Sequence, residues 1–296
     1  MTPGMVYRQL DSAERRLILQ GDTWSIGFWR EPPRRIPKGV VIHCPGWSGI
    51  ADSPRYLRWH EALLAAGFAV FAFDFPGRGR SDDAPPVTTI ELQQEALLAA
   101  ISTVRYESGF DAAVGLFGSG ATGGSLVLDA AASVPEVAAV VSQFPIARGS
   151  DWIGHLLSAS QRGSLEGIIE QDRSRRVMGN PGAFIDFAAG RAGRAFQISN
   201  DARAGWIPIE LVESVLQYDP LARAGGVHAP VLFLAVSDDQ ITPESQARSL
   251  ASALGGAHRF VLQRDVSHYE VYTAKADAIE REMVSWFTQY LSPGAG

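Results

Sequence analysis

The chain has little of several features that would assign a protein to a class at once. Cys44 is the one cysteine in 296 residues, which excludes an intrachain disulfide and a cysteine metal cluster. No stretch reaches the roughly 18 apolar residues of a membrane-spanning helix, and the N-terminal residues lack the apolar centre of a secretory signal. We therefore expect a cytoplasmic protein that does not act at a membrane.

The chain has no excess of positive charge, because 32 acidic residues outnumber 26 basic ones and the net charge is −6. Nucleic acid or an anionic membrane would require a basic surface, so neither is expected as a partner. The expected partner is a small-molecule substrate, and no metal or other cofactor is expected. The arginine-rich exception, predicted to be a solvated helix face, comprises Arg173, Arg175 and Arg176. The histidines without the spacing of a metal site are His43, His60, His155, His228 and His258.

Short apolar segments alternate with helical ones from residue 39 onward, which predicts an α/β fold with a mostly parallel sheet and helices on both faces. Residues 15–20 and 23–30 flank Gly21-Asp22 and predict a hairpin at one edge. The other predicted strands are 39–44, 68–75, 112–117, 137–143, 230–236 and 258–263. The predicted helices are 54–66, 89–108, the segment after the glycine-rich turn to about 132, 244–254 and 274–291.

Residues 148–222 interrupt this alternation and contain no convincing strand. A structureless loop of this length is improbable in a compact domain, so the segment is expected to form a helical cap over the sheet. The core is then residues 1–147 and 223–296. The helices expected in the cap are 152–161, 164–177, 183–196 and 208–217.

The sequence VGLFGSGATGG at 114–124 predicts a strand, a tight glycine-rich turn and a helix. A nucleophile elbow has this form and reads G-x-S-x-G, with the attacking serine at its centre. Aligning Gly118 with the first glycine places Ser119 at the variable position and Gly120 at the nucleophile, with Thr122 at the last small residue. The elbow is therefore predicted without its nucleophile.

Three other segments accompany this one in the right order. They are VVIHCPGWSG (40–49), FDFPGRGRSD (73–82), and the pair AVSDDQITP (235–243) and RDVSHYEVY (264–272). Together the four resemble the α/β-hydrolase superfamily over nearly the whole chain. The first is similar to the segment that shapes an oxyanion hole, with Pro45 in place of the usual histidine. The second is similar to a structural turn.

The resemblance implies roles for five positions. Asp239, spaced from Pro243 as in the family, would be the acid, although Asp238 is its neighbour. His268 would be the histidine that the acid orients as general base. The backbone N–H groups of Trp47 and Ala121 would be the oxyanion donors, above Gly120.

The missing serine leaves the reaction open. With Gly120 at the elbow no acyl-enzyme can form there, and the His268–Asp239 dyad would act on substrate or water, as in a lyase, a cyclase or direct hydrolysis. Alternatively Ser119 is the nucleophile of an ordinary serine hydrolase or acyltransferase, although Phe117 then fills a position that requires a small residue. An inactivating substitution at Gly120 is a further explanation, and a non-catalytic small-molecule-binding protein is another.

The expected substrate is a carbonyl compound: an acyl, ester, thioester or polyketide-like molecule, free or bound to a carrier. The residues expected to line its pocket, or else to form the core of the cap, are Trp152, Leu156, Leu157, Phe184, Phe187 and Trp206. Cys44 ends a buried strand and is expected to be a core residue. Ser125, one helical turn beyond Ala121, is expected to pack or cap.

Overall fold

The computed structural model describes residues 12–33, 36–47, 50–82, 84, 89–107, 113–203 and 205–291. The ends of two predicted elements, residues 108 and 112, lie outside these ranges, as do Ser48 and Gly49 of the predicted oxyanion segment.

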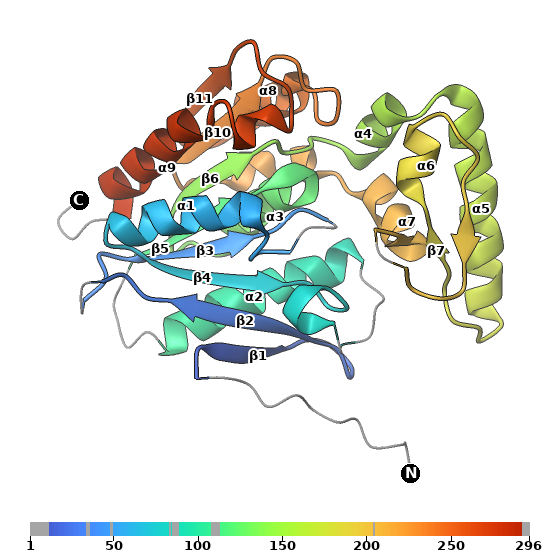
Figure 1. Cartoon of the computed structure of the whole chain (residues 1–296), viewed down its shortest axis with the longest axis horizontal. Coiled ribbons are helices and arrows are strands. Elements are labelled where there is room, and N and C mark those ends of the chain that lie inside the picture. The colour runs from blue at the N-terminus through green and yellow to red at the C-terminus, as the bar shows by residue number, and fades with distance from the viewer. Residues whose placement is uncertain are drawn as a thin grey trace.

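A mostly parallel, eight-stranded sheet runs through the described residues (Figure 1). Only the first two strands break the parallel order. β1 pairs antiparallel with β2, as in the predicted edge hairpin, and β2 pairs antiparallel with β4. In sheet order the strands are β1 (Glu14–Ile18), β2 (Trp24–Arg30), β4 (Ala69–Asp74), β3 (Val40–Cys44), β5 (Val114–Gly118), β6 (Val137–Gln143), β10 (Val231–Val236) and β11 (His258–Gln263).

Helices cover both faces of the sheet, and alternating side chains of each strand pack against them. Val41 and Phe117 face the side covered by α1 and α9, whereas Ile42 and Leu116 face the side covered by α2, α3 and α8. Each buried strand is therefore apolar on both faces, which explains the continuous apolar runs of the sequence. The helices are α1 (Pro54–Ala65), α2 (Ile90–Glu107), α3 (Gly120–Ser133), α8 (Glu244–Ala253) and α9 (Ala276–Leu291).

The turn after β4 forms the tight bend predicted from FDFPGRGRSD, with the short helix η1 (Gly79–Ser81). Asp74 accepts hydrogen bonds from the backbone N–H groups of Ala51 (2.6 Å) and Arg80 (2.8 Å). Gly79 has a φ of 49°, and a Cβ there would lie 2.3 Å from Asp74 Oδ2. The turn thus requires glycine at position 79. Burial raises the pKa of the Asp74 carboxyl to about 6.

Between β6 and β10 the chain leaves the sheet as an insertion, which stands beside the carboxyl ends of the parallel strands (Figure 1). Its small three-stranded sheet corrects the prediction that this segment contains no strand. Strands of two residues are too short to show an alternating pattern. Its elements are α4 (Gly149–Leu156), α5 (Ala159–Val177), β7 (Phe184–Ile185), α6 (Phe187–Arg191), β8 (Ile198–Ser199), β9 (Ile207–Pro208), α7 (Ile209–Gln217) and η2 (Pro220–Gly226).

The predicted helix 183–196 was also wrong in extent, because only α6 forms there. Asp186 caps its start by accepting a hydrogen bond from the Ala189 N–H. Past α6 the chain turns back at Gly193, whose φ is 78°. The Phe196 ring then packs so closely on Gly190 that a Cβ there would lie 1.9 Å from it.

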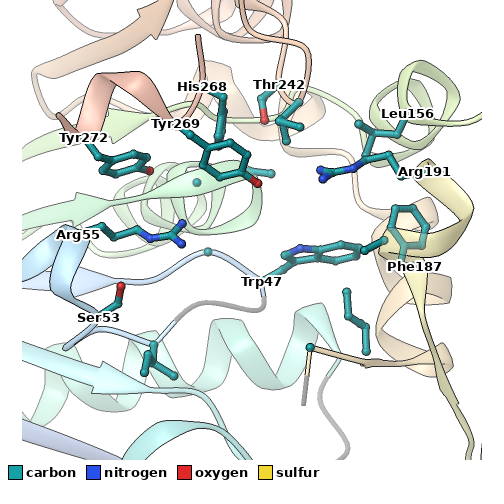
Figure 2. Close-up of a pocket in the computed structure, with 18 of the residues that line it drawn as sticks. Trp47, Ser53, Arg55, Leu156, Phe187, Arg191, Thr242, His268, Tyr269 and Tyr272 are labelled. Atoms are coloured by element: carbon teal, nitrogen blue, oxygen red, sulfur yellow. The ribbon is translucent and has the colours of Figure 1, made fainter. Parts of the chain in front are cut away.

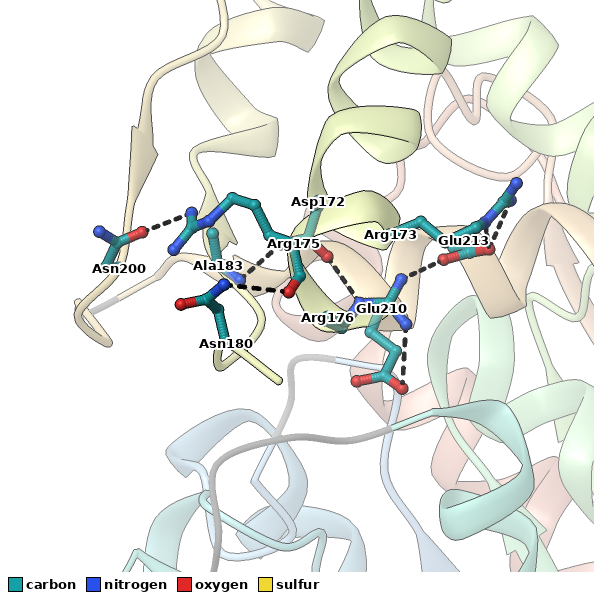
Figure 3. A network of polar contacts seen from close by, with 9 residues as sticks. All are labelled: Asp172, Arg173, Arg175, Arg176, Asn180, Ala183, Asn200, Glu210 and Glu213. Atoms are coloured by element: carbon teal, nitrogen blue, oxygen red, sulfur yellow. Dashed lines mark hydrogen bonds and ion pairs between the residues drawn. The ribbon is translucent and has the colours of Figure 1, made fainter. Parts of the chain in front are cut away.

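The arginines of α5 belong to an ion-pair network rather than to a fully solvated face (Figure 3). Arg176 binds the buried Asp172 of its own helix (2.8 Å) and Glu213 of α7 (2.5 Å). Arg173 binds the same Glu213 at 2.6 Å. Arg175 instead reaches Asn200, at 2.7 Å. The network links α5 to α7 and so fixes the internal packing of the insertion.

None of the helices in the described ranges has both the length and the apolar composition that a membrane crossing requires.

Candidate active site

The turn between β5 and α3 has the backbone of a nucleophile elbow. Gly120 has a φ of 71°, which glycine adopts at no steric cost, whereas Ser119 before it is extended, with a φ of −117°. A Cβ built on Gly120 would find Gly46 Cα at 3.4 Å and no closer atom. The position therefore has the backbone of a nucleophile elbow and room for a Cβ, but no side-chain atom to attack a substrate.

The other glycines of the turn serve close packing. A Cβ on Gly118 would lie 2.2 Å from the carbonyl oxygen of Gly123, and one on Gly123 would lie 2.3 Å from that of Pro45. The start of α3 thus lies directly against the ends of β3 and β5. This contact holds Gly120 close to Gly46.

Ser119 does not face the pocket. Its Oγ lies 2.9 Å from His43 Nε2, and His43 Nδ1 lies 2.9 Å from His60 Nε2. All three residues are fully buried, and Ser119 is not among the residues that line the cavity. The geometry therefore contradicts the alternative with Ser119 as nucleophile, because its hydroxyl is turned into the protein toward an inner histidine.

Burial keeps both inner histidines neutral. It lowers the pKa of His60 to about 3, with the charge of Arg30 as a second cause. Burial also lowers the pKa of His43 well below its usual value, and His60 contributes to the same shift. The sequence marked these histidines only as unsuited to a metal and gave no sign of their hydrogen bond to Ser119.

His268 and Asp239 form a hydrogen-bonded pair in which His268 Nδ1 donates to Asp239 Oδ2 at 2.8 Å. The other carboxylate oxygen accepts the backbone N–H groups of Ile241 (2.8 Å) and Thr242 (2.7 Å). Both members of the pair are buried, whereas Asp238 is exposed. The carboxylate is thus held by three hydrogen bonds, and it holds one nitrogen of the imidazole.

The His268 ring packs against the ring of Phe144, and the two ring centroids are 4.6 Å apart. Phe144 directly follows β6 and has a φ of 52°, a conformation that is rare for a residue with a bulky side chain. Tyr269 packs edge-on against the same His268 ring, with the ring centroids 5.0 Å apart. Nothing in the sequence marked Phe144, because its role depends on a backbone conformation.

A cavity of about 450 Å³ lies between the sheet and the insertion, and Gly120, Ala121, Trp47 and His268 all line it. The carbonyl oxygen of Trp47 accepts a hydrogen bond from Gln93 Nε2 (3.3 Å), which holds its loop against α2. Ala121 lies in the first turn of α3, where backbone N–H groups have no partner within the helix. Two candidate oxyanion donors therefore border the same cavity as the histidine.

The insertion supplies the apolar wall of this cavity (Figure 2). Trp152, Leu156 and Phe187 line it as the sequence suggested, and the Trp47 ring packs edge-on against Trp152 (5.0 Å) and Phe187 (5.4 Å). The Trp152 indole N–H also donates to the carbonyl oxygen of Ile241 at 2.7 Å. The insertion is thus bonded to the loop that carries Asp239.

Three of the suggested pocket residues lie elsewhere. Leu157 and Phe184 are buried and do not line the cavity. Trp206 does not line it either, because its ring stacks with Arg203, whose guanidinium carbon is 4.7 Å from the ring centre. The polar lining residues that sequence reasoning missed are Ser53, Arg55, Tyr56, Arg191, Thr242, Tyr269 and Tyr272.

The remaining candidates are structural. Cys44 is buried at the end of β3, and burial raises the pKa of its thiol. The Ser125 hydroxyl bonds to the carbonyl oxygens of Ala121 (3.1 Å) and Ile146 (2.7 Å), which ties α3 to the segment after β6. Within the described ranges no group of three or more histidine, cysteine and acidic residues is placed to hold a metal.

Residues 40–281 match the family model described as the alpha/beta hydrolase family. The chain is similar to an uncharacterized 31.7 kDa protein of Escherichia coli from the traX-finO intergenic region, with 26% identity over 89% of this chain and 95% of that protein. It is also similar to the quorum-quenching protein AidA of Acinetobacter baumannii, with 24% identity over 86% of this chain and 88% of that protein.

Solved structures share the fold at low sequence identity. DcsB, solved in complex with its substrate analogue, has a TM-score of 0.76 and 17% identity, over 94% of this chain and 98% of that one. The esterase domain of a Rhodothermus marinus protein has a TM-score of 0.65 and 18% identity, over 94% and 98%. These matches and the family model confirm the predicted fold class.

Proposed function

Because the chain belongs to the alpha/beta hydrolase family, we propose that it is an enzyme that hydrolyses an ester or thioester bond of a small molecule with a water activated by His268 and Asp239, without an acyl-enzyme. The observation that carries this proposal is the combination of a fully bonded His268–Asp239 pair with a glycine at the elbow. Names of relatives such as esterase and quorum-quenching protein agree with hydrolysis of small molecules.

The space at Gly120 supports water as the nucleophile. A Cβ built on Gly120 meets only Gly46 within 4 Å, and Gly120 lines the cavity, so there is room beside its Cα for a small group. A water occupying this volume would stand where the serine oxygen stands in other members of the family. In this proposal each turnover therefore consumes one water as the nucleophile, and a new water from the solvent takes its place.

The proposed reaction has two steps. The free nitrogen of His268 takes a proton from the water as its oxygen bonds to the substrate carbonyl carbon, and Asp239 stabilises the imidazolium that forms. The carbonyl oxygen becomes negatively charged and is stabilised by the N–H groups of Trp47 and Ala121. The imidazolium then gives its proton to the leaving oxygen or sulfur as the bond to the carbonyl carbon breaks, which releases an acid and an alcohol or thiol.

The hydrogen bonds of Asp239 favour a catalytic pair over a purely binding pocket. A buried carboxylate is costly unless its oxygens are bonded, and here two backbone N–H groups and the imidazole satisfy it. A receptor for a neutral acyl compound has no need of this arrangement. We further propose that residues 148–222 act as a cap that shields the reacting water, and that carrier-bound acyl groups are among the substrates.

Activity against a panel of 4-nitrophenyl esters and acyl thioesters tests the proposal. His268→Ala and Asp239→Asn should each lower kcat, by about 10²–10⁴-fold for the histidine, and Ser125→Ala serves as a control outside the pair. Product formed in ¹⁸O-water should carry the label in its carboxylate. Turnover without label would indicate proton abstraction, as in a lyase or cyclase, and ligand binding with no turnover at all would indicate a receptor.

A further inference from the structure

The cavity carries positive charge within an acidic chain. Two arginines, Arg55 and Arg191, line it, and none of its described lining residues is an aspartate or a glutamate. The chain as a whole has a net charge of −6. Figure 2 shows the two side chains pointing into the cavity from opposite sides, Arg55 from α1 and Arg191 from α6 of the insertion. The charge at this site is thus opposite in sign to that of the chain.

Arg55 has no carboxylate partner among the described residues. Its guanidinium carbon lies 5.5 Å from the ring centre of Tyr272 and 5.9 Å from those of Tyr56 and Tyr269. These aromatic faces hold the cation in place but leave its N–H groups unbonded. Arg58, one turn later on the same helix, is paired with acidic residues of α9 and does not line the cavity.

Hydroxyl groups beside the cavity are also uncommitted. Ser53 is the N-cap of α1, yet its side chain makes no capping hydrogen bond. Thr242 is only 3% exposed and lines the cavity, and its Oγ1 has no hydrogen-bond partner. Because this hydroxyl lines the cavity, it is free to donate to a group of a bound ligand.

The wall opposite Arg55 is mainly apolar, with Trp47, Leu156 and Phe187 near Arg191 (Figure 2). A ligand complementary to both walls has an apolar part and a charged acid group. These two parts lie on either side of the carbonyl group on which His268 acts. The charged group must be an oxyanion, because guanidinium N–H groups and hydroxyls are both donors to such a group.

We infer that the substrate is an acidic ester or thioester, one that carries a free carboxylate or phosphate besides its reactive carbonyl, and that Arg55 binds this acid group. The inference rests on the proposed function, since it names the substrate class of the same site. Arg191 faces the ligand from the insertion and adds to the attraction.

A matched pair of substrates tests the inference: the 4-nitrophenyl monoester of glutaric acid and 4-nitrophenyl valerate, which have chains of similar length with and without a carboxylate. Wild-type protein should prefer the acidic ester. Arg55→Gln should raise KM for the acidic ester by about 10- to 100-fold, the value of a hydrogen bond to a charged group, and leave KM for the neutral ester unchanged. Arg55→Lys should retain part of the preference, and Arg281→Gln, an exposed change on α9, should retain all of it.

A binding experiment separates this inference from the proposed function. Calorimetry on His268→Ala with the monoanilide of glutaric acid and with valeranilide, which are not hydrolysed, should give tighter binding of the acid, lost in the double variant with Arg55→Gln. Inorganic phosphate as competitor then assigns the acid group: strong competition favours a phosphate and weak competition a carboxylate. Acid-selective binding without turnover in wild-type protein would sustain this inference and overturn the proposed function alone. Equal binding of the two anilides would overturn the inference.

Discussion

Replacing Gly120 by serine should convert the site into an ordinary serine nucleophile. The added Cβ would lie 3.4 Å from Gly46 Cα and 3.9 Å from Gly46 N, which are ordinary contact distances, so no clash opposes it. The cost is conformational, because a side chain at a φ of 71° is strained by about 1–3 kcal/mol. We expect the melting temperature to fall by about 2–5 °C as a result.

The matched control is Gly120→Ala, which carries the same strain without the hydroxyl. Gly120→Ser should react with a fluorophosphonate at residue 120, as seen by intact-protein and peptide mass spectrometry, whereas Gly120→Ala and the wild-type chain should stay unlabelled at this position. The labelling of Gly120→Ser should disappear when His268 is also changed to alanine. A folded Gly120→Ser protein that resists the reagent would refute the argument, because it would mean that His268 cannot reach the elbow.

Two further predictions concern the buried residues behind the elbow. Ser119→Ala should leave kcat unchanged but lower the free energy of unfolding by about 1–3 kcal/mol, because His43 loses a partner in a fully buried site. A loss of activity at unchanged stability would contradict the assigned orientation of Ser119. The folded-state pKa values of His43 and His60 lie below the usual histidine value. Both histidines therefore contribute stability that is fully present above pH ~6.5. This stability is lost as the pH falls toward the folded-state pKa, which is about 3 for His60. Urea unfolding between pH 7 and pH 5 should therefore show a loss of unfolding free energy that approaches about 1.4 kcal/mol per pH unit for each histidine. The slope should be shallower in His60→Asn. Equal slopes would contradict the neutral state of His60.

The sequence predicted the sheet and its helices because their signals are local. The buried strand 137–143 is a short apolar run, and the edge strand 258–263 has an apolar centre; the structure gives both the predicted bounds. The choice of Asp239 over Asp238 depended on the spacing to Pro243, and Asp239 is the residue bonded to His268. Motif spacing thus carried information on the site wherever neighbouring residues fix the backbone.

The remaining parts of the site depend on contacts between distant segments. Arg55 meets Tyr272 across more than two hundred residues, and Arg55 belongs to none of the four motif segments. Ser119 follows β5 and His43 lies in β3, so their hydrogen bond leaves no local pattern. The pocket wall was partly misassigned for the same reason: the aromatic residues of the insertion look alike in sequence, and only packing decides that Phe187 lines the cavity while Phe184 does not.

The most direct test of the account is the state of the wild-type protein during turnover. A cleavable ester from the panel is mixed with the protein, quenched in acid at times from milliseconds to steady state, and the intact protein is weighed. We predict continued release of product with no burst and no acyl adduct at any time, and loss of that release in His268→Ala. An acyl adduct that forms and decays at the rate of turnover, on any residue, would contradict the central claim that water is the nucleophile.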